Sequence, residues 1–143
     1  MENSLNINQM YRLPWTKDDN PDGWIEVTTY CQLKCPGCYR GLAEENPKRI
    51  HEDFEKIKSE IDLLIKSRNI QTLSIAGGEP LLYPKIKEVI AYAFSKGIKT
   101  KIFTNGVLLT KENLIKLKDT GVTEFVVHVD KYQKRPDTRD HKN

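Results

Sequence analysis

The sequence predicts an α/β fold in which repeated strand and helix units build a parallel sheet. Short segments rich in β-branched and aromatic residues alternate with longer segments in which apolar residues recur at helical spacing. Strands that are connected through helices run parallel, so their carboxyl ends meet at one edge of the sheet. A chain of 143 residues has the length of one domain. The predicted strands span residues 24–29, 71–76, 99–104 and 123–129, and the predicted helices span residues 52–67, 84–96 and 111–119.

The first unit follows an N-terminal arm, residues 1–23, that is rich in Asn, Asp and Pro and ends in a turn. Strand 24–29 is followed by a loop that contains every cysteine of the chain. Helix 52–67 has acidic residues in its first turn, where they complement the helix dipole. Its apolar face is formed by Phe54, Ile57, Ile61, Leu64 and Ile65.

The second and third helices carry recognisable start and stop signals. Pro84 suits the first position of a helix because its φ angle is already fixed, and Gly97 suits the end. Thr110 is the predicted N-cap of the third helix, which ends before Gly121. The residues that the second helix is expected to bury are Ile86, Val89, Ile90, Ala93 and Phe94.

Composition narrows the classes of partner. The net charge of +3 comes from 23 basic and 20 acidic residues spread along the chain, and the basic stretch 131–135 is followed by Pro and Asp, so nucleic acid is not a favoured partner. No apolar run approaches the roughly 20 residues of a membrane span. The N-terminus lacks the features of a secretory signal, which predicts a cytoplasmic, reducing environment. The domain prediction is an arm (1–23), a core (24–130) and a polar tail (131–143).

The most informative motif is the cysteine triplet Cys31, Cys35 and Cys38, spaced as Cys-x-x-x-Cys-x-x-Cys. Three thiolates on one loop can hold three irons of a cubane iron-sulfur cluster and leave the fourth iron open. The same thiols could bind zinc with His51 or His128 as the fourth ligand. Alternatively, Cys35 and Cys38 alone form a Cys-x-x-Cys thiol-disulfide motif, which leaves Cys31 without a role.

Unusual segments also follow the other strands. Gly77-Gly78-Glu79-Pro80 follows the second strand, Thr104-Asn105-Gly106 follows the third, and His128-Val129-Asp130 closes the fourth. Each segment alone is most simply a turn. Ligands of parallel α/β proteins bind at the carboxyl ends of the strands, so together the segments predict one pocket.

With these motifs the chain resembles the radical S-adenosylmethionine (radical SAM) superfamily over about residues 24–130. The resemblance implies that the fold is about half of a partial TIM-type barrel, with four strands and three helices. It also implies that Cys31, Cys35 and Cys38 bind a 4Fe-4S cluster whose open iron is chelated by S-adenosylmethionine. The cofactor-binding residues implied by the resemblance are Gly77, Gly78, Glu79, Pro80, Tyr39, Asn105 and Asp130, with His128 as a weaker candidate.

The function implied by the resemblance is that of an enzyme that cleaves S-adenosylmethionine reductively and abstracts hydrogen from a substrate through a 5'-deoxyadenosyl radical. A flavodoxin or ferredoxin would then supply the electron. The family barrel has later strands that this sequence lacks, which implies a truncated or split form and a partner chain that completes the barrel. The alternative is a non-catalytic module that binds a 4Fe-4S cluster or zinc.

Overall fold

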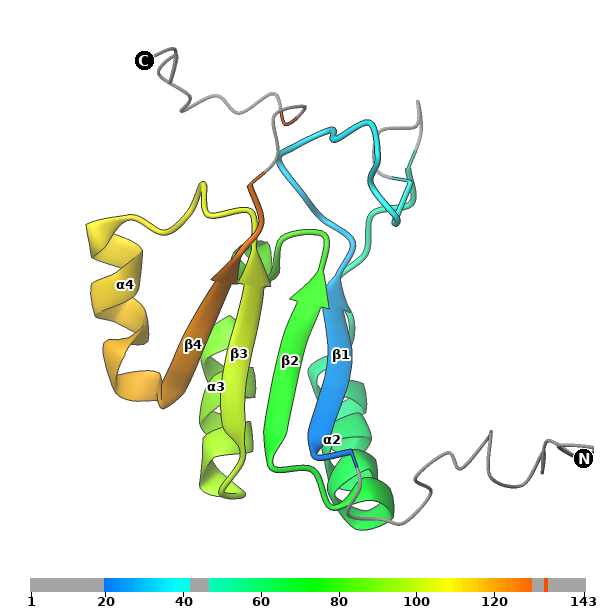
Figure 1. The fold of residues 1–143 in the computed structure, drawn as a ribbon, viewed down its shortest axis with the longest axis vertical. Helices are drawn as coiled ribbons and strands as arrows, with labels where there is room; N and C mark the ends of the chain where they lie inside the picture. The colour runs from blue at the N-terminus through cyan, green and yellow to red at the C-terminus, as the bar shows by residue number, and fades with distance from the viewer. Residues whose placement is uncertain (1–19, 42–46, 130–132, 134–143) are drawn as a thin grey trace, which may run out of the picture.

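The computed structural model describes residues 20–41, 47–129 and 133. These residues form a four-stranded parallel sheet with the strand order β1-β2-β3-β4 (Figure 1), which confirms the predicted α/β fold. The strands are β1 (Asp22–Thr28), β2 (Thr72–Gly77), β3 (Lys99–Thr104) and β4 (Val122–Val127). The helices are α2 (Phe54–Arg68), α3 (Ile86–Ser95) and α4 (Lys111–Leu117), with 3-10 turns η1 (Pro80–Leu82) and η2 (Lys118–Thr120).

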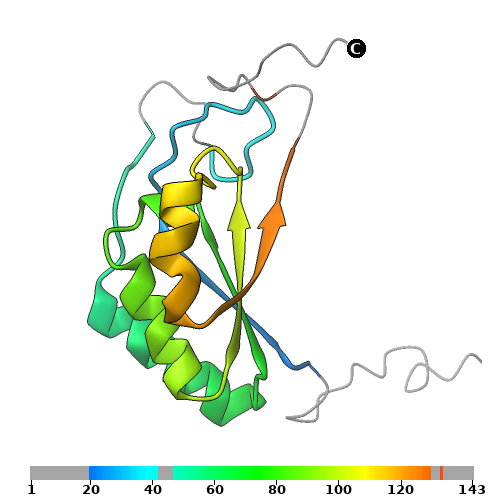
Figure 2. The ribbon, with the colours of Figure 1, turned by 90° about the vertical axis from the view of Figure 1, so that its left-hand side faces the viewer.

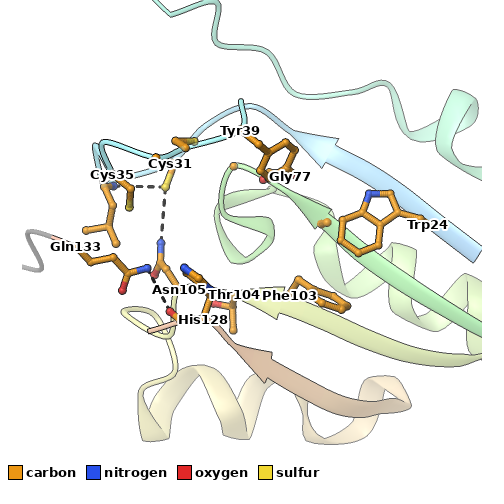
Figure 3. Close-up of a pocket in the computed structure, with 15 residues that line it drawn as sticks. Trp24, Cys31, Cys35, Tyr39, Gly77, Phe103, Thr104, Asn105, His128 and Gln133 are labelled. Atoms are coloured by element: carbon orange, nitrogen blue, oxygen red, sulfur yellow. Dashed lines mark hydrogen bonds between the residues drawn. The ribbon is translucent and has the colours of Figure 1, made fainter. Parts of the chain in front are cut away.

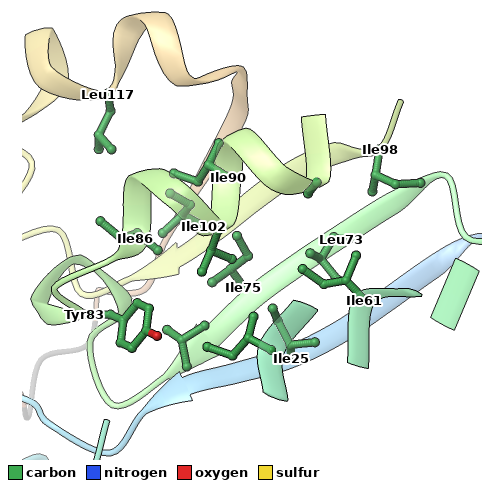
Figure 4. Packing of buried hydrophobic residues seen from close by; sticks show 14 of the residues in the cluster. Ile25, Ile61, Leu73, Ile75, Tyr83, Ile86, Ile90, Ile98, Ile102 and Leu117 are labelled. Carbon is green, nitrogen blue, oxygen red and sulfur yellow. The ribbon is translucent and has the colours of Figure 1, made fainter. Parts of the chain in front are cut away.

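The hydrophobic core lies between the sheet and helices α2 and α3, which cover the same face of the sheet (Figures 1 and 2). Successive side chains of a strand point to opposite faces, so every second strand residue faces these helices. Ile61, Ile75, Ile90 and Ile102 are fully buried in this layer (Figure 4). Burying one such side chain contributes about 1.5–3 kcal/mol. The core therefore fixes the strand ends relative to one another.

Caps define where the first and last helices begin. The Asp53 carboxylate accepts a hydrogen bond from the Lys56 backbone N–H at 3.1 Å, so α2 begins two residues later than predicted. Thr110 caps α4 as predicted, because its hydroxyl accepts from the Asn113 N–H at 3.2 Å. The chain then tightens into η2 and turns at Gly121, whose φ of 90° suits glycine.

The second predicted helix is shorter than expected, and two of its details are wrong. Pro84 lies in a turn after η1, and α3 begins at Ile86. Phe94 was expected in the core, but it is 62% exposed near the end of α3. Its ring lies over Gly121, where a Cβ atom would come within 2.4 Å of the ring. Helical spacing predicted the face of α3 but not this contact with a distant glycine.

The carboxyl ends of the four strands lie at one edge of the sheet, at the top of Figure 1, as the sequence predicted. Most of the predicted arm, most of the polar tail and Asp130 lie outside the described residues. Strand β1 begins at Asp22, inside the predicted arm. None of the helices in the described part of the chain has the length and hydropathy to cross a bilayer.

Candidate functional site

The loop that carries the cysteines is closed at its base by contacts between its two ends. The Thr29 N–H donates to the Ile50 carbonyl at 2.9 Å, and Thr28 forms an antiparallel bridge with His51. The Thr28 hydroxyl lies 2.8 Å from His51 Nδ1, and the His51 ring stacks on Tyr30 with centroids 4.3 Å apart. His51 therefore supports the base of the loop and does not line the pocket described next.

The three cysteines line one pocket of about 340 Å³ at the carboxyl edge of the sheet (Figure 3). None of the three forms a disulfide within the described part of the chain, and each has intermediate exposure. Residues that follow β2, β3 and β4 also line this pocket. The prediction that the loops after the strands line one pocket is therefore confirmed. Its lining consists of Trp24, Cys31, Leu33, Cys35, Gly37, Cys38, Tyr39, Ala76, Gly77, Gly78, Phe103, Thr104, Asn105, His128 and Gln133.

Gly77 and Gly78 line the pocket because their backbone packs directly on the start of the cysteine loop. A Cβ atom on Gly77 would lie 2.3 Å from the Thr28 carbonyl oxygen, and one on Gly78 would lie 2.3 Å from that of Tyr30. Gly77 also has a φ of 135°, which disfavours other residues. The Gly78 N–H donates to the Thr28 carbonyl at 2.7 Å. Glycine is thus required here for contact between two protein loops.

Glu79 is fully buried and lies outside the pocket lining, as does Pro80, which begins η1. The Glu79 carboxylate accepts hydrogen bonds from the Leu81 N–H at 3.0 Å, the Thr104 hydroxyl at 2.9 Å and the Asn105 N–H at 2.9 Å. No cationic side chain among the described residues pairs with it. Burial raises the pKa of this carboxyl, and the three donors oppose the rise. Glu79 joins the loop after β2 to the end of β3.

Asn105 connects this network to the first cysteine. Its side-chain Nδ2 donates to the Cys31 sulfur at 3.7 Å (Figure 3). The same Nδ2 donates to the Gln32 side-chain oxygen Oε1 at 3.4 Å. Its Oδ1 accepts from the Val107 N–H at 3.0 Å, which forms an Asx turn. The Cys31 sulfur also accepts from the Leu33 N–H at 3.4 Å. Asn105, predicted to bind cofactor, is in contact with a predicted cluster ligand.

Tyr39, which follows Cys38, has an exposed ring and an anchored hydroxyl. The residue is 70% exposed, whereas its hydroxyl donates to Glu26 Oε1 at 2.9 Å and lies 3.4 Å from the Gly77 carbonyl oxygen. Desolvation of the hydroxyl and this bond to Glu26 raise the pKa of Tyr39 to about 12. Glu26 also pairs with Arg40. The last turn of the cysteine loop is thereby tied to β1.

Several pocket residues were not predicted from the sequence. Trp24 and Phe103 form an aromatic pair with centroids 4.9 Å apart on the sheet face opposite the helices (Figure 3). Strand alternation could have identified both, since each neighbours a buried isoleucine. Buried Leu33 and Gln133 carry no sequence signal; the Gln133 side chain donates to the His128 carbonyl at 3.3 Å.

The donor set, three cysteine thiols from one loop, is of the kind that iron-sulfur clusters use. Among the described residues, no three His, Cys, Asp or Glu side chains are grouped as ligands of one metal ion. The cysteine ligands of a cluster each bind a different iron, so they do not have to converge on one point, and here all three line the same pocket. Burial raises the pKa of the Cys31 thiol, so a bound cation would have to displace its proton.

Comparison with known proteins gives consistent matches. The model of the radical SAM superfamily matches residues 25–142. An Fe-coproporphyrin III synthase from Methanosarcina barkeri is 31% identical over 127 residues, covering 82% of this chain and 29% of that protein. The structure of BtrN in complex with AdoMet and 2-DOIA has a TM-score of 0.65 at 22% identity, covering 82% of this chain and 50% of that chain. Streptococcus suis SuiB bound to S-adenosylmethionine has a TM-score of 0.55 at 28% identity, covering 73% of this chain and 24% of that chain.

The alignments cover most of this chain but only part of the matched proteins. The chain spans between 20% and 35% of the length of the curated relatives compared with it. The predicted resemblance is confirmed, and with it the S-adenosylmethionine and 4Fe-4S cofactors that members of the family use. The chain belongs to the radical S-adenosylmethionine superfamily.

Proposed function

We propose that this chain binds a 4Fe-4S cluster through Cys31, Cys35 and Cys38 and holds S-adenosylmethionine beside it in the same pocket. The observation that carries the proposal is that the three cysteine side chains line one pocket together with the Gly77–Gly78 loop. When bound, the reduced cluster supplies one electron that cleaves S-adenosylmethionine to methionine and a 5'-deoxyadenosyl radical, which abstracts hydrogen from the substrate.

The Gly77–Gly78 loop would orient the amino acid end of S-adenosylmethionine. The N–H groups of Gly78 and Glu79 already donate to the carbonyls of Thr28 and Tyr30, each at 2.7 Å. The loop would therefore present carbonyl oxygens to the pocket, and these are suitable acceptors for an ammonium group. Glu79 would act indirectly, because its carboxylate is buried behind the loop.

The apolar part of the pocket would hold the rest of the cofactor and exclude water. Trp24 and Phe103 cover the sheet below the cysteine loop, and the exposed ring of Tyr39 is available to pack on the adenine. Asp130, proposed from the resemblance as a ribose ligand, follows β4 beyond the described residues.

The remaining parts of the proposal concern partners. Val127 at the end of β4 and Val129 two residues after it are exposed, at 46% and 69%. We propose that further β/α units, from a longer form of this chain or from a partner, cover this edge and complete the substrate site. A flavodoxin or ferredoxin would supply the electron, and the thiols require a reducing compartment such as the cytoplasm.

The test is anaerobic reconstitution of the chain with iron and sulfide, followed by measurement of bound iron, visible absorbance and dithionite-dependent formation of 5'-deoxyadenosine. We expect a cluster in the wild type, no cluster in Cys35→Ala, and an intact cluster in Lys34→Ala, an exposed neighbour in the same loop. No cluster in the wild type would refute the proposal.

Two other results would point to the alternatives. Bound zinc that is lost in His128→Ala, at the histidine that lines the pocket, would indicate a zinc site. A cluster that forms without any cleavage of S-adenosylmethionine would indicate a non-catalytic module or a half-site that needs its partner, and size-exclusion measurement with added candidate partners would separate these two cases.

A further inference from the structure

Asn105 and Cys31 lie 74 positions apart in the sequence, yet the Asn105 side chain donates to the Cys31 sulfur at 3.7 Å (Figure 3). We propose that Asn105 raises the reduction potential of the cluster through this N–H···S hydrogen bond, as a positioning residue that acts through Cys31. The inference rests on the cluster binding proposed above.

The orientation of the Asn105 amide follows from its surroundings. A backbone N–H can only donate, so the atom that faces the Val107 N–H at 3.0 Å must be the oxygen Oδ1. The NH₂ group then points to the other side, toward Cys31 and Gln32. Gln32 completes a reciprocal amide pair, since its Nε2 donates to Asn105 Oδ1 at 3.3 Å. If the Asn105 amide were flipped, its oxygen would face the Cys31 sulfur and its NH₂ group would face the Val107 N–H, so that two donors would face each other.

The backbone of Asn105 is held independently. Its N–H donates to Glu79 Oε2 at 2.9 Å, and the Thr104 hydroxyl donates to the same buried carboxylate. Glu79 is fully buried, so water does not compete for these bonds. The amide donor is therefore fixed both through the side chain and through the backbone before any cluster binds.

A donor fixed beside a thiolate ligand favours the more negative form of the cluster. Reduction adds an electron, and part of the added charge resides on the cysteine sulfurs. Hydrogen bonds to these sulfurs stabilise that charge and shift the potential upward. Within the part of the chain that the structure describes, Cys31 receives two such donors, the Leu33 N–H from its own loop and the Asn105 side chain from the end of β3. Only the second can be removed by changing a side chain.

The test compares three variants of the whole chain after anaerobic reconstitution, with the cluster potential measured by redox titration followed by electron paramagnetic resonance. Asn105→Ser keeps a hydroxyl that can accept from the Val107 N–H but cannot reach the sulfur. Asn105→Asp keeps Oδ1 and places an oxygen in the position of the donor. Gln32→Ala removes the neighbouring amide and leaves the Asx turn, so it is the matched control.

We expect a more negative potential in Asn105→Ser than in the wild type, a still more negative one in Asn105→Asp, and a potential close to that of the wild type in Gln32→Ala. If neither Asn105 variant has a more negative potential than the wild type, the inference is wrong, while the proposed cluster stands. If the wild type binds no cluster, the proposed function fails and the inference fails with it.

Discussion

Replacing Glu79 by glutamine tests whether this buried carboxylate holds the loops of the site together. The wild-type side chain offers two acceptor oxygens to three donors: Oε1 accepts from the Leu81 N–H at 3.0 Å, Oε2 from the Asn105 N–H at 2.9 Å, and the Thr104 hydroxyl lies 2.9 and 3.0 Å from the two oxygens. Glutamine has the same shape but only one oxygen. Whichever way the amide turns, its NH₂ group faces a backbone N–H.

The magnitude follows from the loss of one acceptor at a buried position. A buried donor left without its partner costs about 1–3 kcal/mol, and a bond to a charged acceptor is worth about 1.5–3 kcal/mol. Glutamine carries no charge, and burial disfavours the ionised carboxyl of the wild type. Removal of the charge therefore offsets part of the lost free energy of unfolding. We therefore expect Glu79→Gln to lower the free energy of unfolding by about 2 kcal/mol at neutral pH.

The pH dependence has a definite sign. The pKa of Glu79 in the folded protein is raised above the ordinary value of 4.5, so the folded protein binds this proton more tightly than the unfolded chain does. Protonation of Glu79 at low pH therefore contributes to the stability of the folded protein. That contribution is lost as the pH rises through the raised pKa. Glutamine does not titrate, so the difference in stability between wild type and variant should narrow as the pH increases.

The measurement is urea unfolding of both proteins at about pH 5 and about pH 8, followed by tryptophan fluorescence and circular dichroism. Glu88→Gln, at an exposed position of α3, is the control and should change stability by less than about 0.5 kcal/mol. If Glu79→Gln unfolds at the same urea concentration as the control at both pH values, the Glu79 carboxylate does not hold these loops together.

Two further predictions concern neighbouring parts of the site. Gly78→Ala should lower the thermal midpoint by several degrees, since its Cβ would lie 2.3 Å from the Tyr30 carbonyl oxygen and such overpacking costs about 1–3 kcal/mol. Gly37→Ala, with no atom within 4 Å, should leave the midpoint unchanged, and equal shifts would contradict this account. Tyr39 should titrate near pH 12 in nuclear magnetic resonance spectra. Glu26→Gln should lower this pKa, because a neutral acceptor favours the protonated phenol less, and an unchanged pKa would show that Glu26 is not a cause.

Strand and helix identities were predictable because they depend on local patterns. The β-branched residues that mark β2 and β3, such as Ile75 and Ile102, and the Thr110 cap are each recognisable from a few neighbouring residues. The position of Phe94 was not predictable, because its ring lies over Gly121, which belongs to another unit of the fold. The start of α3 at Ile86 was also not predictable, because the chain first forms the 3-10 turn η1 (Pro80–Leu82) before Pro84.

The site shows the same division between local and distant information. The spacing of the cysteines and the parallel connections were enough to predict that the strand-end loops line one pocket. The direction of the Glu79 side chain could not be predicted. A carboxylate next to two glycines is as compatible with a contact to a ligand as with hydrogen bonds inside the protein. Its orientation depends on donors at Thr104 and Asn105, which the sequence places 25 and 26 positions away.

The link from Glu79 to Asn105 also fixes the order in which the site can be assembled during synthesis. A ribosome releases Cys31, Cys35 and Cys38 long before the residues of β3, and domains form as their segments emerge. Until β3 pairs with β2, the Asn105 amide cannot reach the Cys31 sulfur. The three thiols are therefore present in the nascent chain before the Asn105 side chain that contacts Cys31 has been synthesised.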